Sequence, residues 1–136
     1  MNARTVADGD VGTVRSIFDA FATRDLAALG RLFHEDATWH HRNHDRLGGR
    51  HRGSDGIAAY LAEAAHLTGG TLRPVPRSFM TDNGGRVCVL VHVSGTRPDG
   101  RSFDDPQVAL FTVEGGRVRS VDQYVGDPAA VAAFWA

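Results

Sequence analysis

Histidine side chains gather in residues 38–52, which read TWHHRNHDRLGGRHR. An imidazole group has an ordinary pKa of about 6.5, so it can give or take a proton near neutral pH, and it is also a common metal ligand. The stretch has three interpretations: a proton-transfer site, a metal site, or a solvated loop rich in imidazole. Four of the chain's seven histidines lie in it: His40, His41, His44 and His51.

A further histidine, His92, lies in the apolar segment RVCVLVHVSG. The segment reads as a β-strand, whose successive side chains point to opposite faces. We expect the face that carries His92 and Ser94 to line a cavity, because the other face has the pattern of plain β-branched packing. That other face, which we expect to be the convex one, carries Val87, Val89, Val91 and Val93.

Metal binding is not predicted. His40, His44 and His51 lie in a predicted loop, and the chain has no helical H-x-x-x-H or H-E-x-x-H pattern. Cys88 is the only cysteine, which excludes an intramolecular disulfide and a thiolate zinc cluster. We therefore expect His44 and His51 to lie on a solvated rim, while His40 or His41 lines a cavity.

Composition narrows the function classes. The chain has 136 residues, 42% of them apolar, and a net charge of −1, which gives no electrostatic argument for nucleic acid or an acidic membrane. All 15 basic residues are arginine, so a lysine Schiff base is excluded. No apolar run is long enough for a membrane span or export signal, so we expect a cytoplasmic protein. No feature calls for a cofactor.

The first part of the chain has helical spacing. Apolar residues from Val11 onward recur at helical intervals, Asp25 can cap a second short helix, and Ser54 or Asp55 can cap a third that ends at Thr68. Residues 1–10 are polar, and we expect them to be frayed. The apolar face of the first helix carries Val14, Ile17, Phe18 and Phe21.

The rest of the chain is strand-like. A short strand at residues 37–41 precedes a loop at 42–53, and four longer strands with hairpin-length turns predict an antiparallel meander. Asp127-Pro128 can start a terminal helix. We therefore predict one α+β domain over residues 1–136, with three helices packed on a strongly curved sheet around a cone-shaped cavity. The four strands are 71–80, 86–96, 101–113 and 117–125.

Three segments in this order carry a resemblance: VRSIFDAFATRDLAALGRLFHEDATWH, RGSDGIAAYL and VALFTVEGGRVRSVDQYV. Over residues 11–125 the chain resembles the nuclear transport factor 2-like superfamily, in its SnoaL-like and ketosteroid-isomerase-like branch. The resemblance implies the fold more than the chemistry, because this fold hosts isomerases, epoxide hydrolases, polyketide cyclases and proteins that only bind.

Known catalytic patterns of these relatives are not matched. The place of the ketosteroid isomerase base is taken by His41, and the two groups of its oxyanion hole fall near Ile17 and Ala109. The aspartate pair of the epoxide hydrolases is matched by Asp105 at one position, but Gln123 stands near the other. Neither activity is carried over to this chain.

The resemblance implies which side chains enter the cavity. Trp39 and His41 are expected to face inward, with His40 as the alternative. The strand SFDDPQVALFTV places Asp105 and Gln107 inward, with Asp105 near the cavity mouth. In the last strand the comparison favours Gln123, with Asp122 in reserve. The residues expected to shape the cavity are Trp39, Phe18, Phe33 and Tyr60.

The leading hypothesis is a small-molecule enzyme that performs an isomerisation, cyclisation or hydrolysis. His41 or His92 would act as base, and Asp105 as acid or as the group that orients the histidine. It requires His92 and at least one of His40 and His41 to share a cavity with Asp105. The alternatives are a non-catalytic binding protein for a hydrophobic small molecule, or a dimerisation module. The valine stripe predicts a homodimer through the convex sheet face.

Overall fold

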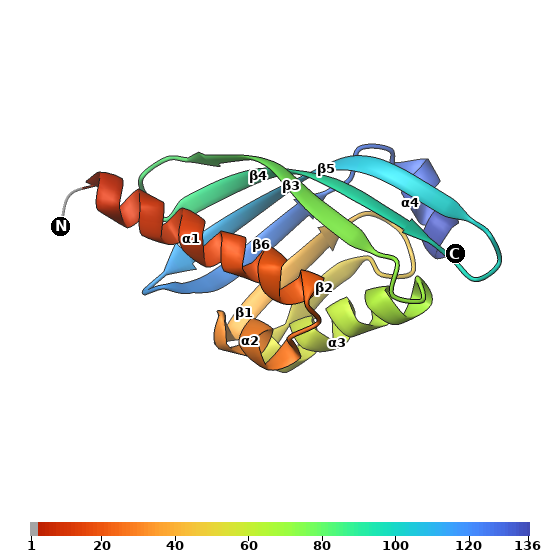
Figure 1. Cartoon of the computed structure of the whole chain (residues 1–136), viewed down its shortest axis with the longest axis horizontal. Helices are drawn as coiled ribbons and strands as arrows, with labels where there is room; N and C mark the ends of the chain where they lie inside the picture. Colours follow the sequence, from red (N-terminus) through yellow and green to blue (C-terminus); the bar gives the residue numbers. More distant parts are fainter. Residues whose placement is uncertain (1–2) are drawn as a thin grey trace.

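The computed structural model describes residues 3–136 as helices packed on one face of a curved, six-stranded sheet (Figure 1). This confirms the α+β class. The helices are α1 (Ala3–Ala22), α2 (Leu26–Arg31), α3 (Gly53–Leu67) and α4 (Pro128–Trp135), and the strands are β1 (Phe33–Arg42), β2 (Gly49–Arg52), β3 (Arg73–Thr81), β4 (Arg86–Thr96), β5 (Ser102–Glu114) and β6 (Arg117–Tyr124).

The helix starts follow the local sequence only in part. Asp25 caps α2, as predicted, by accepting a hydrogen bond from the backbone N–H of Ala28. Helix α1 begins at Ala3, well before the predicted start at Val11. Helix α3 begins at Gly53 and has no side-chain cap, so the predicted capping by Ser54 or Asp55 is wrong. The chain passes directly from β2 into α3, with Gly53 in the left-handed region.

The sheet has the strand order β2-β1-β6-β5-β4-β3. Strands β3 to β6 form the predicted antiparallel meander, and β1 runs parallel to β6. Strand β2 was predicted as loop, because its four residues, GRHR, show no apolar alternation. It pairs with the outer edge of β1, where Trp39 lies opposite His51.

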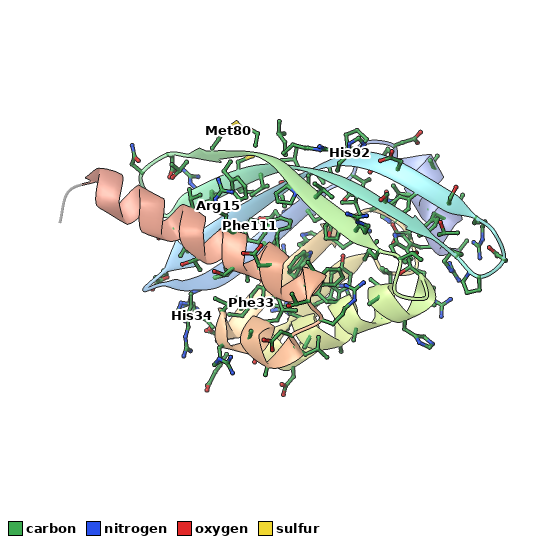
Figure 2. All side chains as sticks on the ribbon, viewed as in Figure 1. Arg15, Phe33, His34, Met80, His92 and Phe111 are labelled. Atoms are coloured by element: carbon green, nitrogen blue, oxygen red, sulfur yellow. The ribbon has the colours of Figure 1, made fainter. Side chains whose placement is uncertain are left out.

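The two faces of β4 are the reverse of the prediction. The valine stripe is buried on the inner face, against the helices, and His92 lies on the outer face. Figure 2 shows His92 and Met80 on the side of the sheet away from the helices, whereas Phe111 lies between sheet and helices. The physical reason is that the inner face must supply the domain core, so it takes the purely apolar set: Val87, Val89, Val91 and Val93.

Helix α4 closes one end of the domain. Asp127 caps it and Pro128 occupies its first turn, as predicted. Phe134 stacks on Phe103 with ring centroids 4.1 Å apart, and Trp135 is buried. Arg97 and Arg101, which flank the β4–β5 turn, both donate hydrogen bonds to the carbonyl of Phe134. Among residues 3–136 no helix is long and apolar enough to cross a membrane.

Candidate active site: a cavity with one polar wall

A cavity of about 90 Å³ lies between the inner face of the sheet, α1 and α3. Its walls are mainly apolar, and its polar groups come from β1, β5, β6 and α3. The predicted cavity residues Phe18, Trp39 and Tyr60 line it. Phe33 does not, because it packs behind Trp39 with ring centroids 6.2 Å apart. Trp135 of α4 also lines the cavity, and the lining residues whose polar atoms are hydrogen-bonded to one another are Trp39, His41, Tyr60, Gln107 and Gln123.

Strand β1 places the first of these groups. Its alternation points Trp39 and His41 inward, as predicted, and leaves His40 on the other face. His40 Nδ1 lies 3.8 Å from Asp122 on that outer face. Burial lowers the pKa of His40, and the nearby Arg42 guanidinium lowers it further. Of the two adjacent histidines, only His41 can meet a molecule in the cavity.

His41 is paired with an aspartate that the sequence analysis missed. His41 Nε2 lies 2.8 Å from Asp45 Oδ2, and the two side chains are 2% and 0% exposed. Asn43 Nδ2 and the backbone N–H of Leu47 also donate to this carboxylate. Burial raises the pKa of Asp45, but the hydrogen bond and charge of His41, with these two donors, hold it below its ordinary value of 3.8.

The signal for this pair was present in the sequence. His41 and Asp45 stand four residues apart in HRNHD, and Leu47 follows as an isolated apolar residue. Leu47 is 2% exposed, so it draws the loop between β1 and β2 into the protein and carries Asp45 inward with it. The sequence signal is therefore the isolated Leu47 two residues after Asp45, and its burial is established only by the fold.

From His41 a row of hydrogen bonds crosses the cavity wall to β5. His41 Nδ1 lies 2.9 Å from the Tyr60 hydroxyl, which donates to Gln123 Oε1 over 2.7 Å. Gln123 Nε2 donates to Gln107 Oε1 over 2.8 Å, and Gln107 Nε2 donates to Asp105 Oδ2 over 3.0 Å. We call Asp45, His41, Tyr60, Gln123, Gln107 and Asp105 the polar row.

The chemistry of the donors fixes the direction of every bond in the polar row. Trp39 Nε1 can only donate, and it donates to Gln123 Oε1 over 2.9 Å, so Gln123 presents its oxygen to Tyr60. The hydroxyl proton of Tyr60 therefore points to Gln123, and His41 Nδ1 must carry the proton of the bond to Tyr60. His41 Nε2 in turn faces the Asp45 carboxylate, so each ring nitrogen of His41 has an oxygen partner inside the protein.

Asp105 has a different place from the one predicted. It is buried on the inner face of β5 but lies behind Gln107, outside the cavity lining. Its carboxylate also accepts hydrogen bonds from the backbone N–H groups of Gly126 and Asp127, each over 3.0 Å. These bonds fix the chain between β6 and α4. Asp105 therefore holds Gln107 and the start of α4 in place and does not reach a bound molecule.

The predicted placement of His92 in the cavity is wrong. Its side chain is 40% exposed on the outer face, and its Nε2 lies 2.7 Å from Asp104, not Asp105. His92, His41 and Asp105 thus share no cavity. His44 is exposed, whereas His51 stacks on Tyr60 with ring centroids 4.1 Å apart. Across residues 3–136 no group of three or more histidine, cysteine, aspartate or glutamate side chains could hold a metal ion.

Burial also defines the chemistry of Tyr60. Removal from water raises the pKa of its hydroxyl, and the negative charge of Asp45 raises it further. The hydroxyl therefore stays protonated and can pass a proton on only when it receives one from His41. In this arrangement the polar row can deliver a proton to the cavity without leaving a buried tyrosinate.

Comparisons with known proteins agree with this architecture. The SnoaL-like domain model matches residues 14–121. An uncharacterised protein of Mycobacterium tuberculosis is 33% identical over 129 residues, which cover 95% of this chain and 98% of that protein. The structure of Bal32a, from a soil-derived mobile gene cassette, superposes with a TM-score of 0.92 at 30% identity and covers 96% of this chain and 99% of Bal32a.

Two further solved structures are described with a ligand or with an activity. TerC, which was co-crystallised with polyporic acid, has a TM-score of 0.81 at 25% identity, over 93% of this chain and 97% of TerC. A putative polyketide cyclase of Sinorhizobium meliloti has a TM-score of 0.68 at 26% identity, over 82% of this chain and 93% of the cyclase. On the family match and the shared fold, the chain belongs to the SnoaL-like family of the nuclear transport factor 2-like superfamily.

Proposed function

We propose that this protein is a cofactor-independent enzyme that binds a small, mainly apolar molecule in the cavity and protonates it from the polar row. The observation that carries the proposal is the buried His41–Asp45 pair, which is linked through Tyr60 to an otherwise apolar cavity. A buried ion pair is costly to form, and it contributes less to stability than apolar packing of the same volume. Its position at the polar wall of the cavity is best explained by chemistry.

The proposed step moves two protons. The Tyr60 hydroxyl turns from Gln123 Oε1 to the bound molecule and gives its proton to an oxygen of that molecule, and His41 Nδ1 gives a proton to the Tyr60 oxygen. His41 is left neutral, with its remaining N–H on Nε2 and directed at Asp45. The proton released from carbon later in the reaction returns to His41 by the reverse route. Such a sequence suits an isomerisation or a cyclisation, both of which conserve protons overall.

The cavity size restricts the substrate. A cavity of about 90 Å³ is smaller than the roughly 300–1,000 Å³ that is usual for drug-sized ligands. We therefore propose a substrate of about one ring, or the reacting end of a longer molecule. Polyporic acid was co-crystallised with TerC. We do not propose a ligand of that size for this chain.

The test uses the tryptophans, because both Trp39 and Trp135 line the cavity. A panel of small ketones and epoxides is screened by intrinsic fluorescence, and turnover of those that bind is followed by NMR. His41→Gln should lower kcat by about 100-fold or more, the usual weight of a general acid, and leave binding in place. His92→Gln, on the outer face, is the matched control and should retain the wild-type rate. Equal rates for His41→Gln and the wild type would refute the proposal.

A second candidate is a binding protein without catalysis. The observation that favours it is that each member of the polar row already has a partner inside the protein. In that case ligands change the tryptophan fluorescence but are recovered unchanged after long incubation, and His41→Gln alters only the affinity.

We also propose that the protein is a homodimer through the outer face of the sheet. The valine stripe cannot be the reason, since it is buried, but Met80, Leu90 and Tyr124 are 45%, 43% and 43% exposed. Sedimentation at micromolar concentration should show a dimer that Leu90→Arg converts to a monomer. Leu26→Arg, at an equally exposed leucine on α2, should leave the dimer intact. A monomeric wild-type protein would contradict the proposal.

A further inference from the structure

The polar row also defines which ligands the cavity accepts, and this inference rests on the function proposed above. We propose that the unused amide N–H groups of Gln107 and Gln123 bind the oxygen of a small neutral molecule, such as a ketone. The site thereby selects hydrogen-bond acceptors over ammonium, carboxylate and hydrocarbon ligands of the same shape. The two glutamines lie on neighbouring strands, and both line the cavity.

The orientation of the Gln123 and Gln107 side-chain amides is fixed by their neighbours, Trp39 and Asp105. Trp39 can only donate, so Gln123 turns its oxygen toward Trp39 and its nitrogen toward Gln107. The Asp105 carboxylate accepts three donors, so Gln107 turns its nitrogen toward Asp105. Neither amide can rotate by 180° without placing like groups against each other. The nitrogen atoms of both side chains therefore keep these positions when a ligand enters.

Each amide nitrogen has two N–H groups and uses one of them in the row. Within residues 3–136 the second N–H of Gln107 and that of Gln123 have no acceptor. The amide oxygen of Gln123 needs a ligand less than the amide nitrogen does, since Gln123 Oε1 already receives hydrogen bonds from Trp39 and Tyr60. An N–H group without an acceptor in apolar surroundings costs about 1–3 kcal/mol, so the cavity favours a molecule that brings one.

Charge decides between neutral and charged acceptors. The row contains two carboxylates, Asp45 and Asp105, and a single basic group, His41, so it carries no excess positive charge. An anionic ligand would have to enter an apolar cavity beside these carboxylates, which is unfavourable. An ammonium ligand would meet amide N–H groups, which are donors like itself. A neutral oxygen acceptor is the ligand that matches both the charge and the direction of the hydrogen bonds.

The test compares four ligands of one shape: cyclohexanone, methylenecyclohexane, cyclohexylammonium and cyclohexanecarboxylate. Their dissociation constants are measured by tryptophan fluorescence on the wild type and on Gln107→Met, which keeps the side-chain length but has no N–H. The affinity for cyclohexanone should fall by about 5- to 10-fold in Gln107→Met, because one neutral hydrogen bond contributes about that much to binding. The affinity for methylenecyclohexane should not fall. Both charged ligands should bind more weakly than the ketone.

Phe18→Leu is the matched control, because Phe18 lines the same cavity without a polar atom. It should change the affinities for ketone and hydrocarbon by the same factor. A second measurement does not depend on any variant: cyclohexanone should shift the side-chain amide NMR signals of Gln107 and Gln123 in the wild type, and methylenecyclohexane should shift them far less.

The outcomes separate this inference from the proposed function. An unchanged ratio of ketone to hydrocarbon affinity in Gln107→Met overturns the inference, as does tighter binding of either charged ligand, and neither result bears on turnover. Unshifted amide signals with bound ketone also overturn it. Conversely, a wild-type kcat for His41→Gln refutes the proposed function and leaves the ligand selectivity measurable.

Discussion

Asp45→Asn should lower the free energy of unfolding by about 3 kcal/mol or more. The substitution removes the carboxylate from the buried His41–Asp45 pair and leaves His41 Nε2 without that partner, and breaking a buried pair typically costs about 3–5 kcal/mol. The new side-chain amide would also present an N–H₂ group or a neutral oxygen to donors that now meet a carboxylate. Urea denaturation followed by circular dichroism measures the loss.

Asp82→Asn is the matched control, because Asp82 also pairs with a basic residue four positions away, Arg86, but on the surface. Its loss of stability should be far smaller, since water already screens that pair. Equal losses in the two variants would show that the His41–Asp45 pair contributes no more to stability than a surface ion pair.

The same pair gives a pH dependence with a definite sign. The pKa of Asp45 is lower in the folded protein than its ordinary value of 3.8. Its contribution to stability is therefore fully present above that value and is lost as the pH falls through the folded pKa. Between about pH 4 and pH 2 the wild type should lose more stability than Asp45→Asn. Parallel losses in that range would contradict the assignment.

Trp135→Ala should lower the free energy of unfolding by about 3 kcal/mol and enlarge the cavity. Trp135 is 4% exposed, lines the cavity and packs against Phe103 and Phe134. Truncation of a buried tryptophan typically costs about 3–5 kcal/mol, because contacts are lost and space is left behind. Thermal and urea unfolding measure the loss, and binding of two-ring ketones measures the enlargement.

Trp135→Phe keeps most of the contacts and should lose much less stability. If Trp135→Ala unfolds at the same urea concentration as the wild type, the packing of Trp135 in α4 does not stabilise the domain. If it is destabilised but still excludes two-ring ligands, the size limit is set elsewhere in the cavity, and the aromatic rings of α1 are then the next residues to test.

The sequence predicted which side chains share a face better than it predicted which face is buried. In β1 the alternation placed Trp39 and His41 on one face and the family resemblance turned that face inward, and both side chains do line the cavity. In β4 the alternation was read correctly, but His92 was assigned to the inner face. A period of two contains no information about which side the helices cover, and that depends on packing between distant segments.

The polar row shows a second limit on what the sequence can predict about the site. Tyr60, Gln107 and Gln123 were predicted to lie at the cavity, but Asp45, which lies in the loop predicted at residues 42–53, was not singled out. A loop turns inward when one apolar side chain finds a place in the core, as Leu47 does, and that place exists only in the folded domain. The hydrogen bond from Trp39 to Gln123, which orients the Gln123 amide, was also not predicted, because it joins two strands that are distant in the sequence.

The parallel pairing of β1 with β6 has a consequence for the order of folding. Strands β3 to β6 are joined by short hairpins, so their contacts close small loops, whereas 84 residues separate Trp39 from Gln123. Contacts between distant segments carry the larger entropic cost and form more slowly. The meander can therefore assemble while β1 is still unpaired, and such an intermediate has no polar row and no closed cavity. Ligand binding thus begins only when the slowest contact of the fold has formed.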